Sequence, residues 1–445
     1  MARANIYKFQ KMATVNIYKW NELGKEDKTR ILTRSEVEIE EVMQKVKEIV
    51  KDVKENGDDA IAKYCKKFDN VDLKPSEFKV SEEEIKDAYN NIDKNLLKAI
   101  KRANRNIQNF HKAQMPKDIE IEIEKDVIAG RRTLPLESTG LYVPGGKAVY
   151  PSVMLMLSAP AKVAKVRTII ACTPTRTKNL DPATIVAADL NNVALYKIGG
   201  IQAIAAMAYG TETIPNVEVI AGPGNPYVSA AQRIVAADAK TKISFPPGPS
   251  EGMVIADEFA NPKFCAADMI SEAEHGPDSA GILVTYSEKL AKEVRIHAEL
   301  MIEKLPDVRK HYIEENLKKY SGIILTENLQ QAIDFVNEYA PEHLVIACRN
   351  PRRLMKKIKN AGTICLGNWT PITAGNFMVG SNAILPTGKY GKIFSGISID
   401  TFLKFPTYEI LTKRGLKRIR SDLNLFCDFE GFPGHKNAVE VRFQK

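Results

Sequence analysis

The sequence VALYKIGGIQAIAAMAYGTETIPNVEVIAGPGNPYVSAAQRIVA, residues 193–236, decides the fold class. It contains two short apolar segments, 193–197 and 217–220, each followed by a glycine-containing turn and an alanine-rich helical segment. Strands that alternate with helices in this way pair in parallel, with helices on both faces of the sheet. The stretch therefore predicts an α/β fold. Its turns follow the carboxyl ends of the strands, where such sheets bind ligands.

The same alternation continues on both sides of this stretch. Further strands are predicted at 139–143, 167–172, 253–256, 281–285, 322–325, 343–347 and 362–366. Helices are predicted at 35–56, 81–92 and 94–114. Charge thins out from about residue 140, so we expect two Rossmann-like α/β domains with parallel sheets, one inserted in the other. The inserted domain would be 140–250, the major domain 35–139 with 251–397, and the extensions 1–34 and 398–445.

The composition argues against several classes of protein. Lys and Arg outnumber Asp and Glu by 64 to 55, but the two signs are interleaved, which is typical of solvated helix faces and not of a nucleic-acid surface. The cysteines form no C-x-x-C pair, which argues against a disulfide framework. No apolar run resembles a signal peptide or approaches the ~18 residues of a membrane span. We therefore expect a cytoplasmic protein that binds neither nucleic acid nor membrane.

Two pairs of titratable residues are candidates for chemistry. Glu272 and His275 share one face of a predicted helix and can hold a metal ion, although a solvated helix has the same pattern. Glu342 and His343 stand at the start of an apolar strand. They can do general acid–base work, although a turn with a salt bridge has the same sequence. His111 lies on a charged helical face and is expected to be exposed.

Several longer segments, in a fixed order, carry a stronger signal. They are 140–146 (GLYVPGG), 199–205 (GGIQAIA), 222–228 (GPGNPYV), 248–251 (GPSE), 273–278 (AEHGPD), 340–344 (APEHL), 385–388 (LPTG) and 435–438 (HKNA). With them the chain resembles the histidinol dehydrogenase family over about residues 30–443. That family carries out a zinc- and NAD-dependent oxidation of histidinol to the aldehyde and then to histidine, in two hydride transfers.

The resemblance implies roles for individual residues. NAD would be bound in the inserted domain, by Tyr142, Gln202 and Asn225. The small alcohol substrate would be contacted by Ser152, Ser250 and Glu430. Zn²⁺ would be held by Glu272, His275, Asn376 and His435, with Glu342 and His343 as the acid–base pair. The resemblance also implies a homodimer in which 398–445 reaches the partner's site and brings Glu430 and His435 with it.

This chain departs from the family pattern at three positions. Glu272 stands where the family has Gln, and Asn376 stands where the family has Asp, so the carboxylate and the amide have changed places and the charge of the ligand set is kept. Ala383 replaces a substrate-side His and can neither hydrogen-bond nor transfer a proton. Ala383 leaves one alternative open, and Ala383 together with Asn376 leaves a second. One is a paralogue that oxidises another small hydroxylated compound, such as a sulfonated propanediol, and the other is a catalytically silent binding protein.

Overall fold

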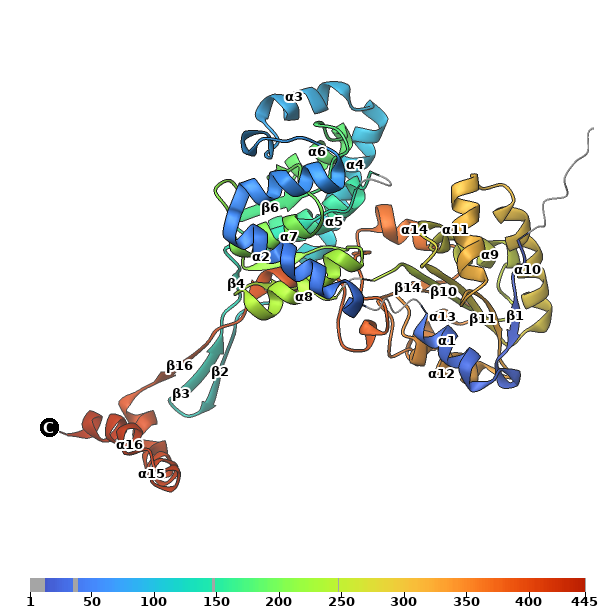
Figure 1. Ribbon diagram of the computed structural model, residues 1–445. Helices are drawn as coiled ribbons and strands as arrows, with labels where there is room; N and C mark the ends of the chain where they lie inside the picture. The colour runs from blue at the N-terminus through green and yellow to red at the C-terminus, as the bar shows by residue number, and fades with distance from the viewer. Residues whose placement is uncertain (1–12, 35–38, 146–148, 247, 445) are drawn as a thin grey trace, which may run out of the picture.

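The computed structural model describes residues 13–34, 39–145, 149–246 and 248–444. Two parallel sheets form the framework, and Figure 1 shows them side by side, each enclosed by helices. The six-stranded sheet has the order β1 (Ile17–Lys19), β12 (Gly322–Leu325), β11 (Ala280–Thr285), β10 (Glu251–Ala256), β13 (His343–Ala347) and β14 (Thr363–Leu366). The five-stranded sheet has the order β7 (Ala194–Tyr196), β6 (Thr168–Cys172), β5 (Ser138–Tyr142), β8 (Val219–Ala221) and β9 (Lys242–Ile243). The predicted α/β fold with parallel sheets is therefore confirmed.

We call the six-stranded sheet and its helices the six-stranded body. Helices α1 (Lys25–Thr33), α12 (Leu329–Tyr339) and α13 (Pro351–Met355) cover one face of this sheet, and α9 (Pro262–Ser271), α10 (Glu288–Ile302), α11 (Asp307–Leu317) and α14 (Ile372–Ala374) cover the other. Strand β10 has apolar side chains on both faces of the sheet. Val254 and Ala256 are buried in the core cluster on one face, and Met253 and Ile255 are buried in the cluster on the other. A strand buried on both faces has a continuous apolar sequence, as β10 does.

The five-stranded body is built in the same way. Its sheet is covered on one face by α3 (Glu82–Asn91), α4 (Lys94–Ala113), α5 (Pro151–Val163) and α6 (Pro182–Asp189), and on the other by α2 (Ile39–Tyr64), α7 (Gly200–Tyr209) and α8 (Pro226–Asp238). Helices α2, α3 and α4 therefore pack on this sheet, whereas the sequence places 35–139 in one domain with 251–397. The reason is that α2 contacts α7 and α8, and α4 contacts α5; helical periodicity fixes the apolar face of a helix but not its partner.

The first described residues also differ from the expected extension 1–34. Residues 1–12 lie outside the described part, but β1 pairs in parallel with β12 at the edge of the six-stranded sheet, and α1 buries Ile31 and Leu32. His111 is a second difference. It was expected to be exposed, but its side chain is completely buried, with Nδ1 2.8 Å from the Ile107 carbonyl oxygen, because α4 turns this face toward α5.

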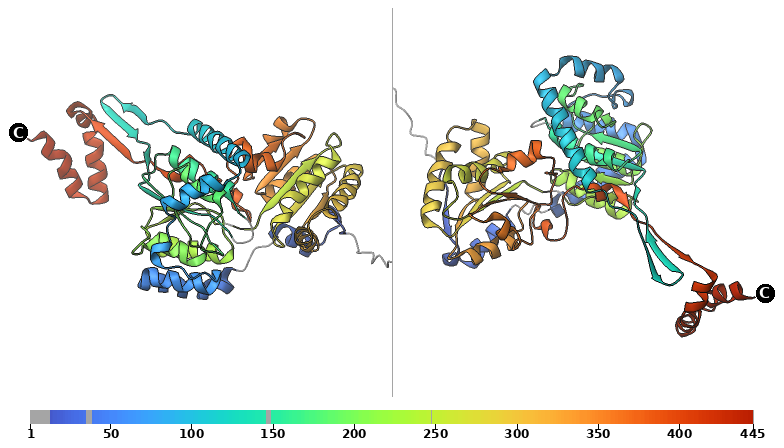
Figure 2. Two further views of the ribbon diagram at one scale, coloured as in Figure 1. Left: turned by 90° about the horizontal axis from the view of Figure 1, so that it is seen from above. Right: turned by 180° about the vertical axis from the view of Figure 1, so that it is seen from behind.

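An arm extends from the five-stranded body. It consists of an antiparallel sheet of β2 (Ile119–Glu124), β3 (Val127–Arg131) and β16 (Thr407–Leu411), followed by α15 (Lys413–Glu430) and α16 (Pro433–Glu440). The short pair β4 (Leu134–Pro135) and β15 (Leu403–Lys404) joins the arm to the body. The views in Figure 2 agree that the two helices lie apart from both bodies. No helix in the described ranges is long and apolar enough to cross a membrane.

Candidate functional site

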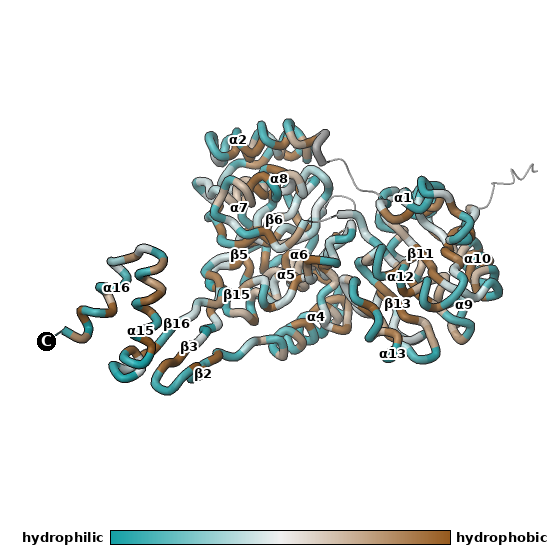
Figure 3. Tube along the Cα trace, turned by 90° about the horizontal axis from the view of Figure 1, so that it is seen from below, coloured by the Kyte–Doolittle hydropathy of each residue, from teal (hydrophilic) through white to brown (hydrophobic). Residues whose placement is uncertain are grey.

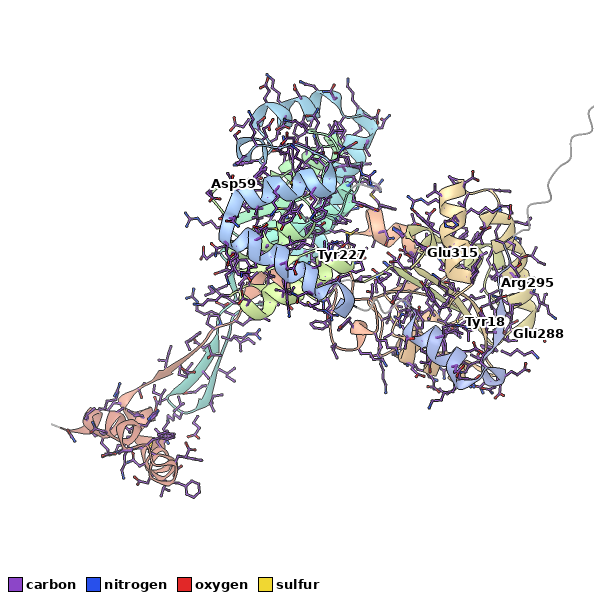
Figure 4. All side chains as sticks on the ribbon, in the orientation of Figure 1. Tyr18, Asp59, Tyr227, Glu288, Arg295 and Glu315 are labelled. Atoms are coloured by element: carbon purple, nitrogen blue, oxygen red, sulfur yellow. The ribbon has the colours of Figure 1, made fainter. Side chains whose placement is uncertain are left out.

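A cavity of about 740 Å³ lies at the carboxyl ends of the strands of the five-stranded body. Its wall includes Tyr142 at the end of β5, Gln202 in the first turn of α7 and Asn225 before α8, which are the three residues predicted to contact NAD. Tyr227, labelled in Figure 4, also lines it, at the amino end of α8. Two helices of ten or more residues, α7 and α8, thus begin at the cavity, and helix amino termini attract anionic groups such as phosphates.

The sequence shapes this cavity through tight turns. The Tyr142 hydroxyl oxygen accepts a hydrogen bond from the Gly200 amide at 3.1 Å, which ties the end of β5 to the start of α7. Asn225 caps α8 by accepting from the Val228 amide at 3.0 Å. Gly222 has φ +138°, and a Cβ there would lie 2.1 Å from the Tyr142 carbonyl oxygen, so only glycine fits. The conformation of the GPGNPYV turn therefore depends on this residue.

Gln202 is only 1% exposed, its amide lies against the Cys65 thiol, and within the described residues neither amide atom has a nitrogen or oxygen partner. Buried polar groups are nearly always hydrogen-bonded, so this amide has donors and an acceptor to offer a ligand in the cavity. Three charged residues of the same wall, Lys45, Asp69 and Arg176, were not predicted from the sequence. Burial raises the pKa of Asp69 to about 6, and the charge of Arg176 opposes that shift.

The predicted metal-ligating residues of the six-stranded body come together at the amino ends of its strands. Glu272 directly follows α9 and is 3% exposed, and its Oε2 lies 3.4 Å from His275 Nε2. Asn376, in a π-helical turn at Gly375–Val379, donates from Nδ2 to Glu272 Oε1 at 2.9 Å. Isolated π-helical turns of this kind frequently mark functional sites. Three of the four predicted ligands thus form one cluster.

This cluster can accept a cation. Asn376 Oδ1 is buried and has no hydrogen-bond partner in the part of the chain that the structure describes. Together with the Glu272 carboxylate and the His275 imidazole it offers oxygen and nitrogen donors that suit Zn²⁺. The described residues contain no group of three or more His, Cys, Asp or Glu that could hold a metal. The cluster has two such residues and an amide, so it needs a further donor from elsewhere.

Glu342 and His343 lie beside this cluster. His343 is the first residue of β13 and pairs with Gly252 of β10, and a Cβ on Gly252 would lie only 3.0 Å from Glu272 Cβ. Both side chains are buried, and Glu342 Oε1 lies 3.7 Å from His343 Nε2. The two side chains thus lie side by side at the amino end of β13.

The electrostatic surroundings of this pair shift both pKa values. Burial raises the pKa of Glu342 well above its usual range, and the negative charge of Glu272 adds to the effect. Burial lowers the pKa of His343, whereas the charge of Glu272 acts in the opposite direction. The raised pKa favours the protonated, donor form of Glu342, and the lowered pKa favours the neutral, acceptor form of His343. Such oppositely shifted neighbours are typical of acid–base sites.

The remaining predicted residues divide into two groups. Ser152, the second residue of α5, and Ser250, just before β10, are half-buried. Glu430 and His435 are exposed on the two arm helices, α15 and α16. Figure 1 shows these helices far from the six-stranded body, so one chain does not bring His435 to the cluster of Glu272, His275 and Asn376.

The arm helices expose large apolar side chains. Phe429 is 93% exposed, and Leu425 and Phe426 are each 68% exposed. Figure 3 shows this apolar colouring along α15 and β2. Gly415 is the one residue that α15 buries, and α16 buries none of its residues. An apolar surface of this kind on an element without a core of its own is typical of an interface with another chain.

Comparison with known proteins identifies the family. The histidinol dehydrogenase profile matches residues 32–443. The histidinol dehydrogenase of Methanocaldococcus jannaschii is 44% identical over 96% of this chain and 99% of its own length. That of Synechocystis is 41% identical over 96% and 98%. A crystal structure of the enzyme from Elizabethkingia anophelis superposes with a TM-score of 0.91 at 37% identity, covering 98% of this chain and 99% of the other. The resemblance seen in the sequence is thus confirmed, and the chain belongs to the histidinol dehydrogenase family.

Proposed function

We propose that this chain is a zinc- and NAD-dependent dehydrogenase that oxidises L-histidinol, through the aldehyde, to L-histidine. The observation that supports the proposal best is that the acid–base pair Glu342 and His343 lies directly beside the donor cluster of Glu272, His275 and Asn376. The names of its relatives supply the substrate. Bound at the cluster and in the cavity, Zn²⁺ would polarise the alcohol oxygen and NAD would accept hydride.

The residues of the chain account for the proton transfers. In the first oxidation the neutral imidazole of His343 accepts the hydroxyl proton of the alcohol while the carbon loses hydride. The second oxidation needs a base for the water that adds to the aldehyde, and Glu342 is suited to it. Burial is the main cause of the raised pKa of Glu342 and the charge of Glu272 adds to it, so a cation held at Glu272 would lower this pKa and favour the base form of Glu342. Ser152 and Ser250 would contact the substrate.

Tyr142, Gln202 and Asn225 would bind NAD in the cavity of the five-stranded body, whose wall also includes residues outside the predicted region 140–250, such as Phe68 and Asp69. The amino termini of α7 and α8 suit its pyrophosphate. The buried amide of Gln202 suits a group with both donors and acceptors, such as the carboxamide or the adenine.

We further propose a homodimer with shared active sites. The apolar side chains exposed on α15 are suited to burial against another chain. The cluster of Glu272, His275 and Asn376 lacks a fourth donor for a metal ion within the described part of the chain. A second copy that received this arm would meet both needs, with His435 as the fourth ligand and Glu430 as a substrate contact.

Absorbance of NADH tests the activity directly. Purified protein supplied with Zn²⁺, NAD and L-histidinol should form two NADH per histidinol consumed, and His275→Ala should lose both bound zinc and activity. The matched control is His311→Ala, which removes an exposed histidine on α11 of the same body and should change neither. Stoichiometric zinc without any NADH from histidinol or related alcohols would refute the dehydrogenase and favour a silent binding protein.

Ala383 favours a second candidate, the oxidation of another small hydroxylated compound such as a sulfonated propanediol. Its side chain packs against apolar neighbours of the five-stranded body and offers no polar group. The variant Ala383→His separates the two candidates. If histidinol is the natural substrate, the variant should not lower kcat/KM for histidinol. If a sulfonated diol is the substrate, the wild-type chain should oxidise it far faster than histidinol.

A further inference from the structure

The carboxylate of Glu251 joins the three segments by which the chain passes between the two bodies. Arg34 follows α1 of the six-stranded body and precedes α2 of the five-stranded body. Glu251 opens β10, where the chain returns after β9. Gly388 belongs to the segment 380–398, which leads to the 3-10 helix Ile399–Phe402 packed on α5. The three connections thus meet at one buried side chain.

The contacts of this carboxylate are numerous and specific. The Arg34 guanidinium donates from Nε to Glu251 Oε1 at 2.7 Å and from Nη2 to Oε2 at 2.5 Å, and the two side chains are only 2% and 3% exposed. The Gly388 amide donates to Oε1 at 2.8 Å. Paired, planar donors of this kind fix a carboxylate in orientation as well as in position.

Glu251 and Glu342 are also joined by two reciprocal hydrogen bonds, each from the backbone amide of one residue to the side-chain carboxyl group of the other. The Glu342 amide donates to Glu251 Oε2 at 3.3 Å, and the Glu251 amide donates to Glu342 Oε2 at 2.9 Å. The second contact occupies one oxygen of Glu342 and leaves Oε1, the atom nearest His343 Nε2, for proton transfer. A side-chain change at Glu251 keeps the bond from its own amide but weakens the hold of its carboxylate on the backbone amide of Glu342, and so on the position from which the Glu342 side chain extends.

The backbone is constrained where these segments meet. Arg34 has φ 44°, and Ala340, two residues before Glu342, has φ 52°; both values are costly for a residue other than glycine. Arg34 also donates to the Tyr339 carbonyl at 2.9 Å and lies 3.7 Å from the centre of the Tyr339 ring. These contacts hold the turn that presents Glu342, and they explain why the strained conformation persists.

We infer that Arg34 and Glu251 are positioning residues that set the orientation of Glu342 and, through the three connections, its placement relative to the NAD cavity. The inference rests on the proposed function, because it assigns the pair a task in that reaction. It predicts an effect on turnover and not on cofactor affinity, since Tyr142, Gln202 and Asn225 belong to the other body.

The test compares the dimeric, zinc-loaded wild type with Glu251→Gln. In either orientation the Gln amide nitrogen replaces one acceptor oxygen, so the side chain loses one bond from Arg34 together with the bond from either Gly388 or Glu342. We expect kcat to fall about 30- to 100-fold, as displacements of about 1 Å in active sites do, with the Kd for NAD within about threefold. Amide hydrogen exchange should become about tenfold faster at Gly388 or Glu342 while the rest of the six-stranded body keeps its protection.

Two further variants complete the test. Arg34→Lys keeps the charge but not the paired donors, so kcat should fall less, about tenfold, and this variant serves if Glu251→Gln does not fold. The matched control is Glu303→Gln, which breaks the Lys310–Glu303 ion pair of 2.6 Å in the same body and should leave kcat within about twofold.

The outcomes separate the two proposals. An unchanged kcat in Glu251→Gln, or parallel losses of kcat, NAD affinity and protection throughout the chain, would overturn the positioning role. A wild-type protein that forms no NADH from histidinol refutes the proposed function instead. In that case amide hydrogen exchange alone tests the positioning role. Selective loss of protection at Gly388 or Glu342 in Glu251→Gln supports the role of Glu251, and unchanged exchange overturns it.

Discussion

The substitution Asn376→Asp places a second carboxylate against Glu272, and its effect on stability follows from the geometry. Asn376 Nδ2 now donates to Glu272 Oε1 at 2.9 Å, so the variant replaces a hydrogen bond by a contact between two acceptors. Two unit charges about 4 Å apart repel by about 4 kcal/mol at an effective dielectric constant of about 20. The chain can avoid this cost by protonating one carboxyl group, which itself costs about 1.4 kcal/mol for each pH unit above a pKa of about 4.

At pH 7, repulsion between the two carboxylates and protonation of one of them each cost about 4 kcal/mol. We therefore expect the metal-free variant to lose about 4 kcal/mol of unfolding free energy. At pH 5 the proton is available for about 1.4 kcal/mol, and the loss should shrink to about 1–2 kcal/mol. Urea unfolding of chelator-treated protein at the two pH values measures the difference. The matched control is the double variant Glu272→Gln with Asn376→Asp, which restores one carboxylate and one amide and should return close to wild-type stability.

This reasoning fails if Asn376→Asp unfolds within 1 kcal/mol of the wild type at pH 7. It also fails if the loss does not depend on pH, because then packing and not charge would be responsible. Divalent cations supply the complementary measurement, since a second carboxylate should tighten their binding. Weaker zinc binding by Asn376→Asp would show that the two residues do not act on the same ion.

Three further predictions concern Glu342, the cavity turn and the arm. Glu342→Gln should lower kcat about 10²- to 10⁴-fold. The same variant should raise the free energy of unfolding at pH 7.5. A carboxyl group whose pKa is raised in the folded state destabilises the protein as the pH rises above the unfolded-state pKa near 4.5, and Gln removes this effect. An equal or lower unfolding free energy in urea would contradict the prediction. Gly222→Ala should raise the KM for NAD at least about tenfold. Gly24→Ala, before α1, where a Cβ would meet nothing within 4 Å, should not, and equal KM values would contradict the cavity assignment. Phe429→Glu should shift the protein toward monomers in sedimentation, and Phe68→Glu, also an exposed phenylalanine but outside the arm, should not.

The sequence predicted those parts of the fold that depend on local pattern. Strands such as β10 and β13 are continuous apolar runs, and α3 and α4 begin at the caps Ser81 and Asp93, so their bounds lie close to those expected. The antiparallel pair β2 and β3 was missed, although the alternating sequence IEIEIE at 119–124 carries the period of a strand. All six residues of β2 are exposed, including its isoleucines. Alternation of apolar and charged residues predicts a strand because the apolar face is normally buried, and in β2 it is not.

The candidate site was predictable in a similar way. The spacing of Glu272 and His275 indicated a shared face, and the structure brings their side chains within 3.4 Å. Lys45, Asp69 and Arg176 were missed because they reach the cavity from α2, from the π-helical turn Cys65–Asp69 and from the loop after β6, and no local signal links these three segments. Arg34 and Glu251 were missed for the same reason, since they are 217 residues apart in the chain.

The separation of α15 and α16 from the two bodies has a genetic consequence. If the arm of one copy completes the site of the other, each site draws His275 and His435 from different chains. A chain with His275→Ala and a chain with His435→Ala would each be inactive alone, yet a mixed dimer would contain one site with both substitutions and one with neither. Random mixing at equal amounts should then restore about a quarter of the sites, so two defective alleles could complement each other within a single gene.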